Sequence, residues 1–268
     1  MEKSRLDHVV IAVNDPRAGS IYQAICGGEP ATHASSDGTA RYTRFYLDAA
    51  VVELAEPLDN PAAGQGGEIA RRMGRAGPGV HLVCVAVADV AERTEALEAE
   101  GVQLVRQDGH VYVHPRSANG VLVQLTPRRE LGPRPKSGDA RLDHVAIRVR
   151  DLDAASGRWE RITGVAAHRM GVHPISGGAF AATRFEMGSR MIELVSPVPG
   201  RPSPLADRLA SHGEGVVAVA LPANDIEVTL ERVRAAGARV LRLEPHWMVH
   251  PKDASGVLIQ LTPRVRHP

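Results

Sequence analysis

The sequence is poor in aromatic residues and has no excess of charge of one sign. Its 268 residues include 3 Phe, 2 Trp and 4 Tyr, so few platforms are available for stacking the bases of a single-stranded nucleic acid. The 32 Lys and Arg residues are nearly matched by 31 Asp and Glu residues, and the formal net charge is +1. Such a balance produces no field that attracts a polyanion, and we expect no nucleic-acid partner.

Cysteine and long hydrophobic runs are also scarce. Cys26 and Cys84 lie among aliphatic residues and are too few for a disulfide scaffold, so we expect free, buried thiols. No segment approaches the roughly 18 apolar residues that a membrane-spanning helix requires. The first residues lack the apolar stretch and the small residues of a secretion signal. We therefore expect a cytoplasmic protein that has no membrane partner.

An internal repeat organises the chain. The segment at Arg5 reads RLDHVVIAVNDPRA and recurs at Arg141 as RLDHVAIRVRDLDA. A second segment at His110 reads HVYVHPRSANGVLVQLTPR and recurs at His246 as HWMVHPKDASGVLIQLTPR. Both copies lie 136 residues apart, and a third pair, VVELAEP and MIELVSP, lies 140 residues apart. Such a repeat indicates tandem domains of the same architecture.

Each half divides again into two modules of the same order. An alternating apolar strand, a helix and three further short strands follow one another twice in each half. The pattern predicts an α+β fold of four βαβββ modules. A proline-rich, charged stretch marks residues 129–140 as a linker, which leaves residues 1–128 and 141–268 as the two domains.

Four polar residues interrupt apolar strands at equivalent places. His8 and Glu53 lie in the first and last strands of the first module. His81 and Gln124 lie in the first and last strands of the second module. Each residue alone is more often structural. Their symmetric coincidence favours a metal site, because two nitrogen and two oxygen donors suit a divalent first-row metal and leave coordination positions open.

This module order resembles the vicinal oxygen chelate superfamily, and within it the methylmalonyl-CoA epimerases. The resemblance is carried by the segments LDHV, VVELAEP, GPGVHLVCVAVADV and HPRSANGVLVQL. It implies two tandem domains with cupped mixed sheets and a divalent metal ion (Co, Mn, Ni, Zn, Fe or Mg) held by a His, a Gln or Glu, a second His and a Glu. Those positions here carry His8, Glu53, His81 and Gln124, and Gln124 departs from the family Glu.

The second half departs further from this pattern. His144, Glu193 and Gln260 match the first half by their offsets, but Val217 stands where the first half has His81. A missing imidazole weakens a four-donor site, so we expect one metal ion per chain, bound in the first half. The second domain is then expected to have an incomplete metal site and a mainly structural role.

The resemblance implies a metal-dependent epimerase or isomerase that removes a proton next to a carbonyl group of an acyl-CoA or small keto substrate. Epimerisation requires an acid–base group on each face of the reacting carbon. Asp37 matches one family acid, although an Asp before Gly38 also stabilises turns. Because Gln124 replaces the other family base, we predict His110 in that role.

Arg44 is predicted to bind substrate, because a guanidinium pairs with carboxylates and phosphates and Arg44 recurs as Arg184. The simpler interpretation, a surface arginine on a strand, stays open. Other functions in the same superfamily also stay open: a ring-cleaving or ketoacid dioxygenase, a glyoxalase-type lyase and a non-enzymatic ligand-binding protein. All of them take a small molecule as partner. Fusion of two halves predicts a pseudo-dimeric monomer, with a homodimer as the alternative.

Overall fold

The computed structural model describes residues 4–59, 67–128, 138–173 and 179–263. Residues 129–137, most of the predicted linker, lie outside this part of the chain. No helix among the described residues is long and apolar enough to cross a membrane.

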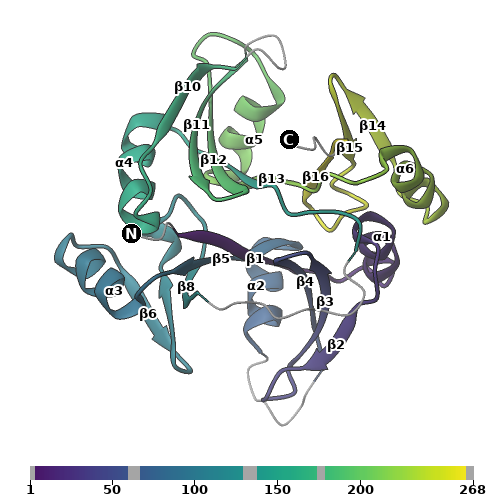
Figure 1. The fold of residues 1–268 in the computed structure, drawn as a ribbon, viewed down its shortest axis with the longest axis horizontal. Helices are drawn as coiled ribbons and strands as arrows, with labels where there is room; N and C mark the ends of the chain where they lie inside the picture. The colour runs from purple at the N-terminus through teal and green to yellow at the C-terminus, as the bar shows by residue number, and fades with distance from the viewer. Residues whose placement is uncertain (1–3, 60–66, 129–137, 174–178, 264–268) are drawn as a thin grey trace. The chain divides into compact units, whose positions relative to one another are not determined.

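The first half forms one eight-stranded sheet (Figure 1). Its elements are β1 (Arg5–Ala12), α1 (Ala18–Cys26), β2 (Ala31–Ala34), β3 (Ala40–Leu47), β4 (Ala50–Pro57), α2 (Glu68–Ala76), β5 (Gly79–Val87), α3 (Val90–Ala99), β6 (Leu104–Gln107), β7 (His110–Val113), a 3-10 turn (Pro115–Ser117) and β8 (Val123–Pro127). The strands follow the order β2-β3-β4-β1-β5-β8-β7-β6.

The second half repeats this plan. Its elements are β9 (His144–Arg148), α4 (Leu152–Thr163), β10 (His168–Val172), β11 (Phe180–Met187), β12 (Arg190–Pro197), α5 (Pro204–His212), β13 (Gly215–Ala220), α6 (Ile226–Ala235), β14 (Val240–Leu243), β15 (His246–Val249) and β16 (Leu258–Leu261). The strand order is β10-β11-β12-β9-β13-β16-β15-β14. The two mixed sheets confirm the predicted α+β fold with four βαβββ modules.

Two compact units cut across these halves. Unit one combines the described residues of 1–7, 82–130 and 143–219, and unit two combines those of 8–81, 131–142 and 220–268. Each unit therefore contains one module from each half, and the two units are described separately below.

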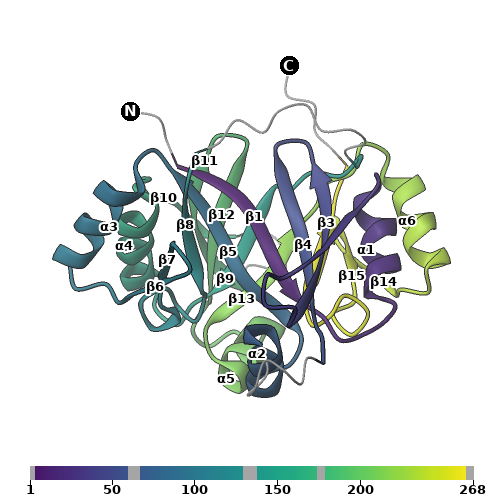
Figure 2. The same ribbon diagram turned by 90° about the horizontal axis from the view of Figure 1, so that it is seen from below.

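In unit two, helices α1 and α6 pack against each other (Figures 1 and 2). The buried Tyr22 of α1 donates its hydroxyl to the carbonyl oxygen of Ala254, 3.1 Å away. Arg232 of α6 forms an ion pair of 3.0 Å with Asp139. Both contacts join residues more than 90 positions apart in the chain, so they link the first module to the fourth.

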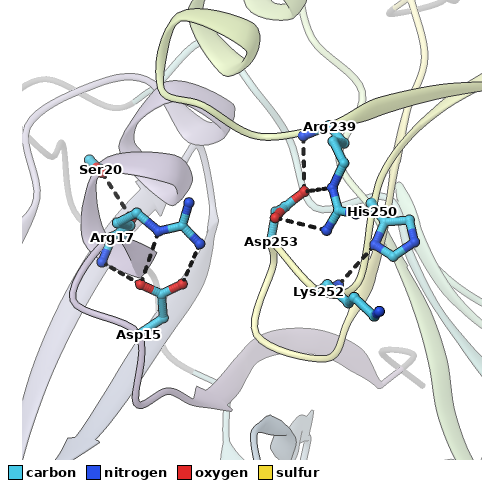
Figure 3. Close-up of polar contacts among 7 residues, drawn as sticks. All are labelled: Asp15, Arg17, Ser20, Arg239, His250, Lys252 and Asp253. Atoms are coloured by element: carbon cyan, nitrogen blue, oxygen red, sulfur yellow. Dashed lines mark hydrogen bonds and ion pairs between the residues drawn. The ribbon is translucent and has the colours of Figure 1, made fainter.

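Figure 3 shows two further polar clusters of unit two, each of which fixes a loop. Asp15 accepts hydrogen bonds of 2.9 Å from the backbone N–H and the guanidinium of Arg17, just before α1. Asp253, between β15 and β16, accepts from the backbone N–H of Arg239 at 3.0 Å and from its Nε at 2.7 Å. The same guanidinium holds the pKa of Asp253 below its usual range. Both carboxylates satisfy backbone donors outside the strand pairing.

In unit one, α3 lies beside α4 (Figures 1 and 2). The fully buried Trp159 of α4 donates its indole N–H to Asn119, 3.2 Å away, and the Asn119 amide donates to Glu214 at 3.0 Å. The buried residues of both units are predominantly aliphatic. Cys26 and Cys84 are free and buried, as expected from the sequence.

Candidate functional site

Glu53 is the centre of a polar group on one face of the first module, in unit two. It is 5% exposed. The register places Val10 of β1 and Arg44 of β3 opposite Glu53, and His8 lies two residues before Val10. Because successive side chains alternate between the faces of a sheet, His8, Arg44 and Glu53 share one face. The Nε of Arg44 donates to the Glu53 carboxylate, which is thereby paired with a positive charge.

A further imidazole joins this group from β2, and the sequence did not single it out. The Nε2 of His33 lies 4.0 Å from Oε1 of Glu53. Its ring stacks on Tyr42 of β3, with centroids 5.2 Å apart and an interplanar angle of 17°. The first module thus presents His33, Arg44 and Glu53 together.

The third module, in unit one, builds the same arrangement. Glu193 of β12 is 7% exposed and lies opposite Arg184 of β11, whose Nε donates to Glu193 at 2.8 Å. His144 of β9 shares the face of Glu193, because Ala146, two residues further, lies opposite Glu193. The ring of His173 stacks on Phe180, with centroids 5.1 Å apart.

Electrostatics link these residues to one another. Burial lowers the pKa of His173, and the charge of Glu193 opposes this shift. Nδ1 of His144 lies 2.7 Å from the carboxylate of Asp143, which fixes the orientation of the ring. A neutral His173 therefore lies near an ion pair whose two charges balance.

One signal in the sequence could have revealed both histidines. The offset of 140 residues that relates Glu53 to Glu193 also relates Arg44 to Arg184 and His33 to His173. The histidines were missed because the flanking segments differ in sequence, so letter matching alone did not align them.

His81 of β5 does not share the face of Gln124 of β8. The register places Gln124 opposite Cys84. Because side chains alternate along β5, Leu82 lies on the face of Cys84 and Gln124, whereas His81 lies on the other face. There, Nε2 of His81 is 3.2 Å from Oε1 of Glu68, at the start of α2, and this hydrogen bond lowers the pKa of Glu68. Leu82 thus holds on β5 the place that His8 holds on β1.

Gln124 and His110 lie together in unit one. Gln124 is buried and faces Tyr112 of β7. His110 lies two residues before Tyr112 on the same face, is exposed, and meets the Tyr112 ring edge-on with centroids 6.3 Å apart. His114, whose Nδ1 accepts the backbone N–H of Arg116 at 3.1 Å, fixes the following turn.

Asp37 lies in an exposed turn of unit two. Its carboxylate accepts hydrogen bonds from the Ser35 hydroxyl at 2.5 Å and from the backbone N–H and hydroxyl of Thr39 at 3.0 and 2.8 Å. These donors lower the pKa of Asp37. The hydrogen bonds support the turn-forming interpretation of this residue, and its catalytic role stays a prediction.

The fit of a divalent metal can be judged from these positions. His8 and Glu53 share a face, whereas His81 would have to leave Glu68 and cross to the other face of its strand. Among the described residues, the ligand atoms of Asp7, His8 and Cys84 also lie within 4.8 Å of one another. Burial holds the pKa of the Cys84 thiol well above its usual value, so a metal would have to displace the thiol proton. Of the predicted donors, the geometry therefore supports His8 and Glu53 best.

Comparisons with known proteins match both halves. Residues 7–119 match the family model described as the glyoxalase/bleomycin resistance protein/dioxygenase superfamily. Residues 142–258 match the model described as a glyoxalase-like domain. The two matches are consecutive in the chain, in agreement with the internal repeat.

Curated relatives include two epimerases. An ethylmalonyl-CoA/methylmalonyl-CoA epimerase from Cereibacter sphaeroides is 31% identical over 131 residues, which are 45% of this chain and 96% of that protein. The mitochondrial methylmalonyl-CoA epimerase of Homo sapiens is 28% identical over 130 residues, which are 45% of this chain and 72% of that protein. One half of this chain therefore corresponds to nearly the whole bacterial relative.

Among solved structures, a variant of 4-hydroxymandelate synthase from Streptomyces coelicolor matches with a TM-score of 0.72. The match covers 97% of this chain and 92% of that chain, at 16% identity. At this identity the likeness concerns the fold alone.

Proposed function

Because the chain belongs to the glyoxalase/bleomycin resistance protein/dioxygenase superfamily, we propose that it is an epimerase or isomerase that transfers a proton next to a carbonyl group. The substrate is an acyl-CoA or a small keto compound. The observation that carries the proposal is the 31% identity to an acyl-CoA epimerase over 96% of its length. The inward-facing His8 and Glu53, at the positions predicted for metal donors, support it.

We assign a divalent metal ion to the first half. His8 and Glu53 would hold it, and the predicted set adds Gln124 and His81, of which His81 must first give up Glu68. When bound, such an ion polarises a substrate oxygen and stabilises the negative charge of an enolate. The Glu53 carboxylate would exchange part of its contact with Arg44 for the ion.

Three side chains of the chain then act on the substrate. His110 is exposed and accepts the proton, because an imidazole is well suited to acid–base work near neutral pH. Arg44, oriented by Glu53, offers its terminal amino groups to a carboxylate of the substrate. Asp37 is the second predicted acid–base group.

The test is stereochemical. The protein is incubated with one stereoisomer of methylmalonyl-CoA, and the second stereoisomer is followed with time. His110→Gln should lower turnover by about 10²- to 10⁴-fold, the range typical of a lost general base. Glu95→Gln, a change on the exposed side of α3, is the control and should leave turnover unaltered. Equal turnover in His110→Gln and the control would remove His110 from the mechanism.

A further inference from the structure

The second half contains a polar centre that a purely structural copy would not need. Glu193 is buried and charged, and burying a carboxylate costs free energy unless a partner offsets it. The fold supplies that partner, Arg184, from the adjacent strand. Apolar residues of similar volume would fill the same space at less cost. The persistence of the charged pair in both halves therefore favours a role in binding.

The geometry leaves Arg184 able to bind a ligand. Its Nε is occupied by Glu193, and the structure shows no other hydrogen-bond partner for its guanidinium among the described residues. The side chain is 27% exposed, so its terminal amino groups are accessible. A guanidinium held at Nε by a buried carboxylate is fixed in orientation, and its planar fork matches the two oxygens of a carboxylate.

The neighbouring rings define the rest of the centre. The electrostatic influence of Glu193, Arg184 and His144 on His173 shows that these four side chains are near one another. The stacked ring of Phe180 gives His173 an apolar backing. Since the charges of Arg184 and Glu193 balance, the centre suits a singly charged carboxylate better than a doubly charged phosphate.

We propose that the second half holds a second ligand site, formed by Arg184, Glu193, His144 and His173, which binds a small carboxylate. The chain then has two such sites, one around Arg44 and one around Arg184. This inference goes beyond the proposed reaction, since the second site binds its ligand whether or not the first half is an epimerase.

The experiment follows the imidazole signals of the full-length protein by nuclear magnetic resonance during a titration with methylmalonate. The signals of the second centre are identified by their loss in His173→Gln and His144→Gln. Methylmalonate should shift these signals in the wild type and in Arg44→Gln. In Arg184→Gln the apparent affinity at these signals should fall at least about tenfold, the loss expected for one bidentate ion pair.

Two further variants exclude trivial causes. Arg169→Gln removes an exposed arginine of the neighbouring strand β10 and should bind as the wild type does. Arg184→Lys keeps the charge, holds Glu193 and loses the fork, so an intermediate affinity with an intact spectrum rules out misfolding as the cause. An affinity in Arg184→Gln within twofold of the wild type, or no shift of these signals in the wild type, would overturn the proposal.

A parallel titration with inorganic phosphate tests the ligand class. Phosphate should shift the same signals only at higher concentration than methylmalonate. Tighter binding of phosphate would contradict the assignment to carboxylates. Absent turnover of methylmalonyl-CoA combined with carboxylate binding at Arg184 would refute the proposed function and leave this inference standing.

Discussion

At the scale of the residue, Asp37 is a carboxylate whose hydrogen bonds are all made within its own turn. Ser35 and Thr39 donate to it and hold its pKa below the ordinary value of 3.8. A carboxyl group whose pKa is lower in the folded than in the unfolded protein stabilises the fold above the unfolded pKa. That stabilisation is lost as the pH falls through the folded pKa.

We therefore predict a pH-dependent effect of Asp37→Asn. The variant should have a lower free energy of unfolding than the wild type at pH 6, and the difference should disappear as the pH falls below the ordinary pKa of the group. Urea unfolding between pH 3 and pH 7 measures it, with Glu95→Gln as the control. A difference that stays constant down to pH 3 would show that the carboxylate charge is not what these donors stabilise.

His81 shows what the sequence cannot reveal about a residue. HVVIAV at His8 and HLVCVAV at His81 look equivalent, and the letters align without a gap. The pairing of Cys84 with Gln124 shifts the second strand by one residue, which turns His81 to the other face. A slip of one residue reverses every side chain of a strand, and it depends on cross-strand contacts that a single sequence does not display.

At the scale of the element, the start of α2 is fixed by a close approach of two backbones. A Cβ atom on Gly67 would lie 2.1 Å from the Thr39 hydroxyl oxygen and 2.4 Å from its Cβ. Glycine at this position therefore lets α2, which carries Glu68, reach the turn that contains Asp37. The contact positions Glu68 for its hydrogen bond with His81.

Gly67→Ala should consequently destabilise the protein by about 1–3 kcal/mol, the range for overpacking a close contact. Gly74, in the same helix, has nothing within 4 Å of the added Cβ. Gly74→Ala should stabilise by about 0.5–1 kcal/mol, because alanine favours helix over glycine. Chemical unfolding measures both. Equal effects of the two substitutions would show that Thr39 yields and that the contact does not fix α2.

The elements themselves follow from the sequence, because alternating apolar residues and the repeat predict all four modules. Local patterns suffice for this, since each strand and helix is encoded in a few consecutive residues. His33 and His173 required more, because their roles appear only when β2 pairs with β3 and β10 lies beside β11.

At the scale of the whole molecule, each compact unit combines modules from both halves. In unit two, Tyr22 contacts Ala254 and Asp139 pairs with Arg232. In unit one, Trp159 is bonded to Asn119. The sequence predicts the modules but not this partnership, because similar modules could also pair within a half. The contacts that decide it are long-range.

Separated halves should therefore be unstable. Residues 1–128 or residues 141–268 produced alone should unfold without a cooperative transition or self-associate, because each exposes apolar helix surface that its unit normally buries. The two fragments mixed together should form a complex that unfolds cooperatively. Sedimentation and thermal unfolding monitor this. A monomeric, cooperatively folded fragment 1–128 would contradict the importance of contacts between modules of different halves.

The central claim is that the chain transfers a proton next to a carbonyl group. The most direct measurement is the exchange of the hydrogen at C2 of methylmalonyl-CoA for deuterium in D₂O, followed by mass spectrometry, while an electrode records dissolved oxygen. We predict protein-dependent deuterium incorporation without oxygen consumption, lost when chelator removes the metal and restored by adding a divalent ion. Oxygen consumption with an aromatic ketoacid, together with no deuterium incorporation into methylmalonyl-CoA, would contradict the account.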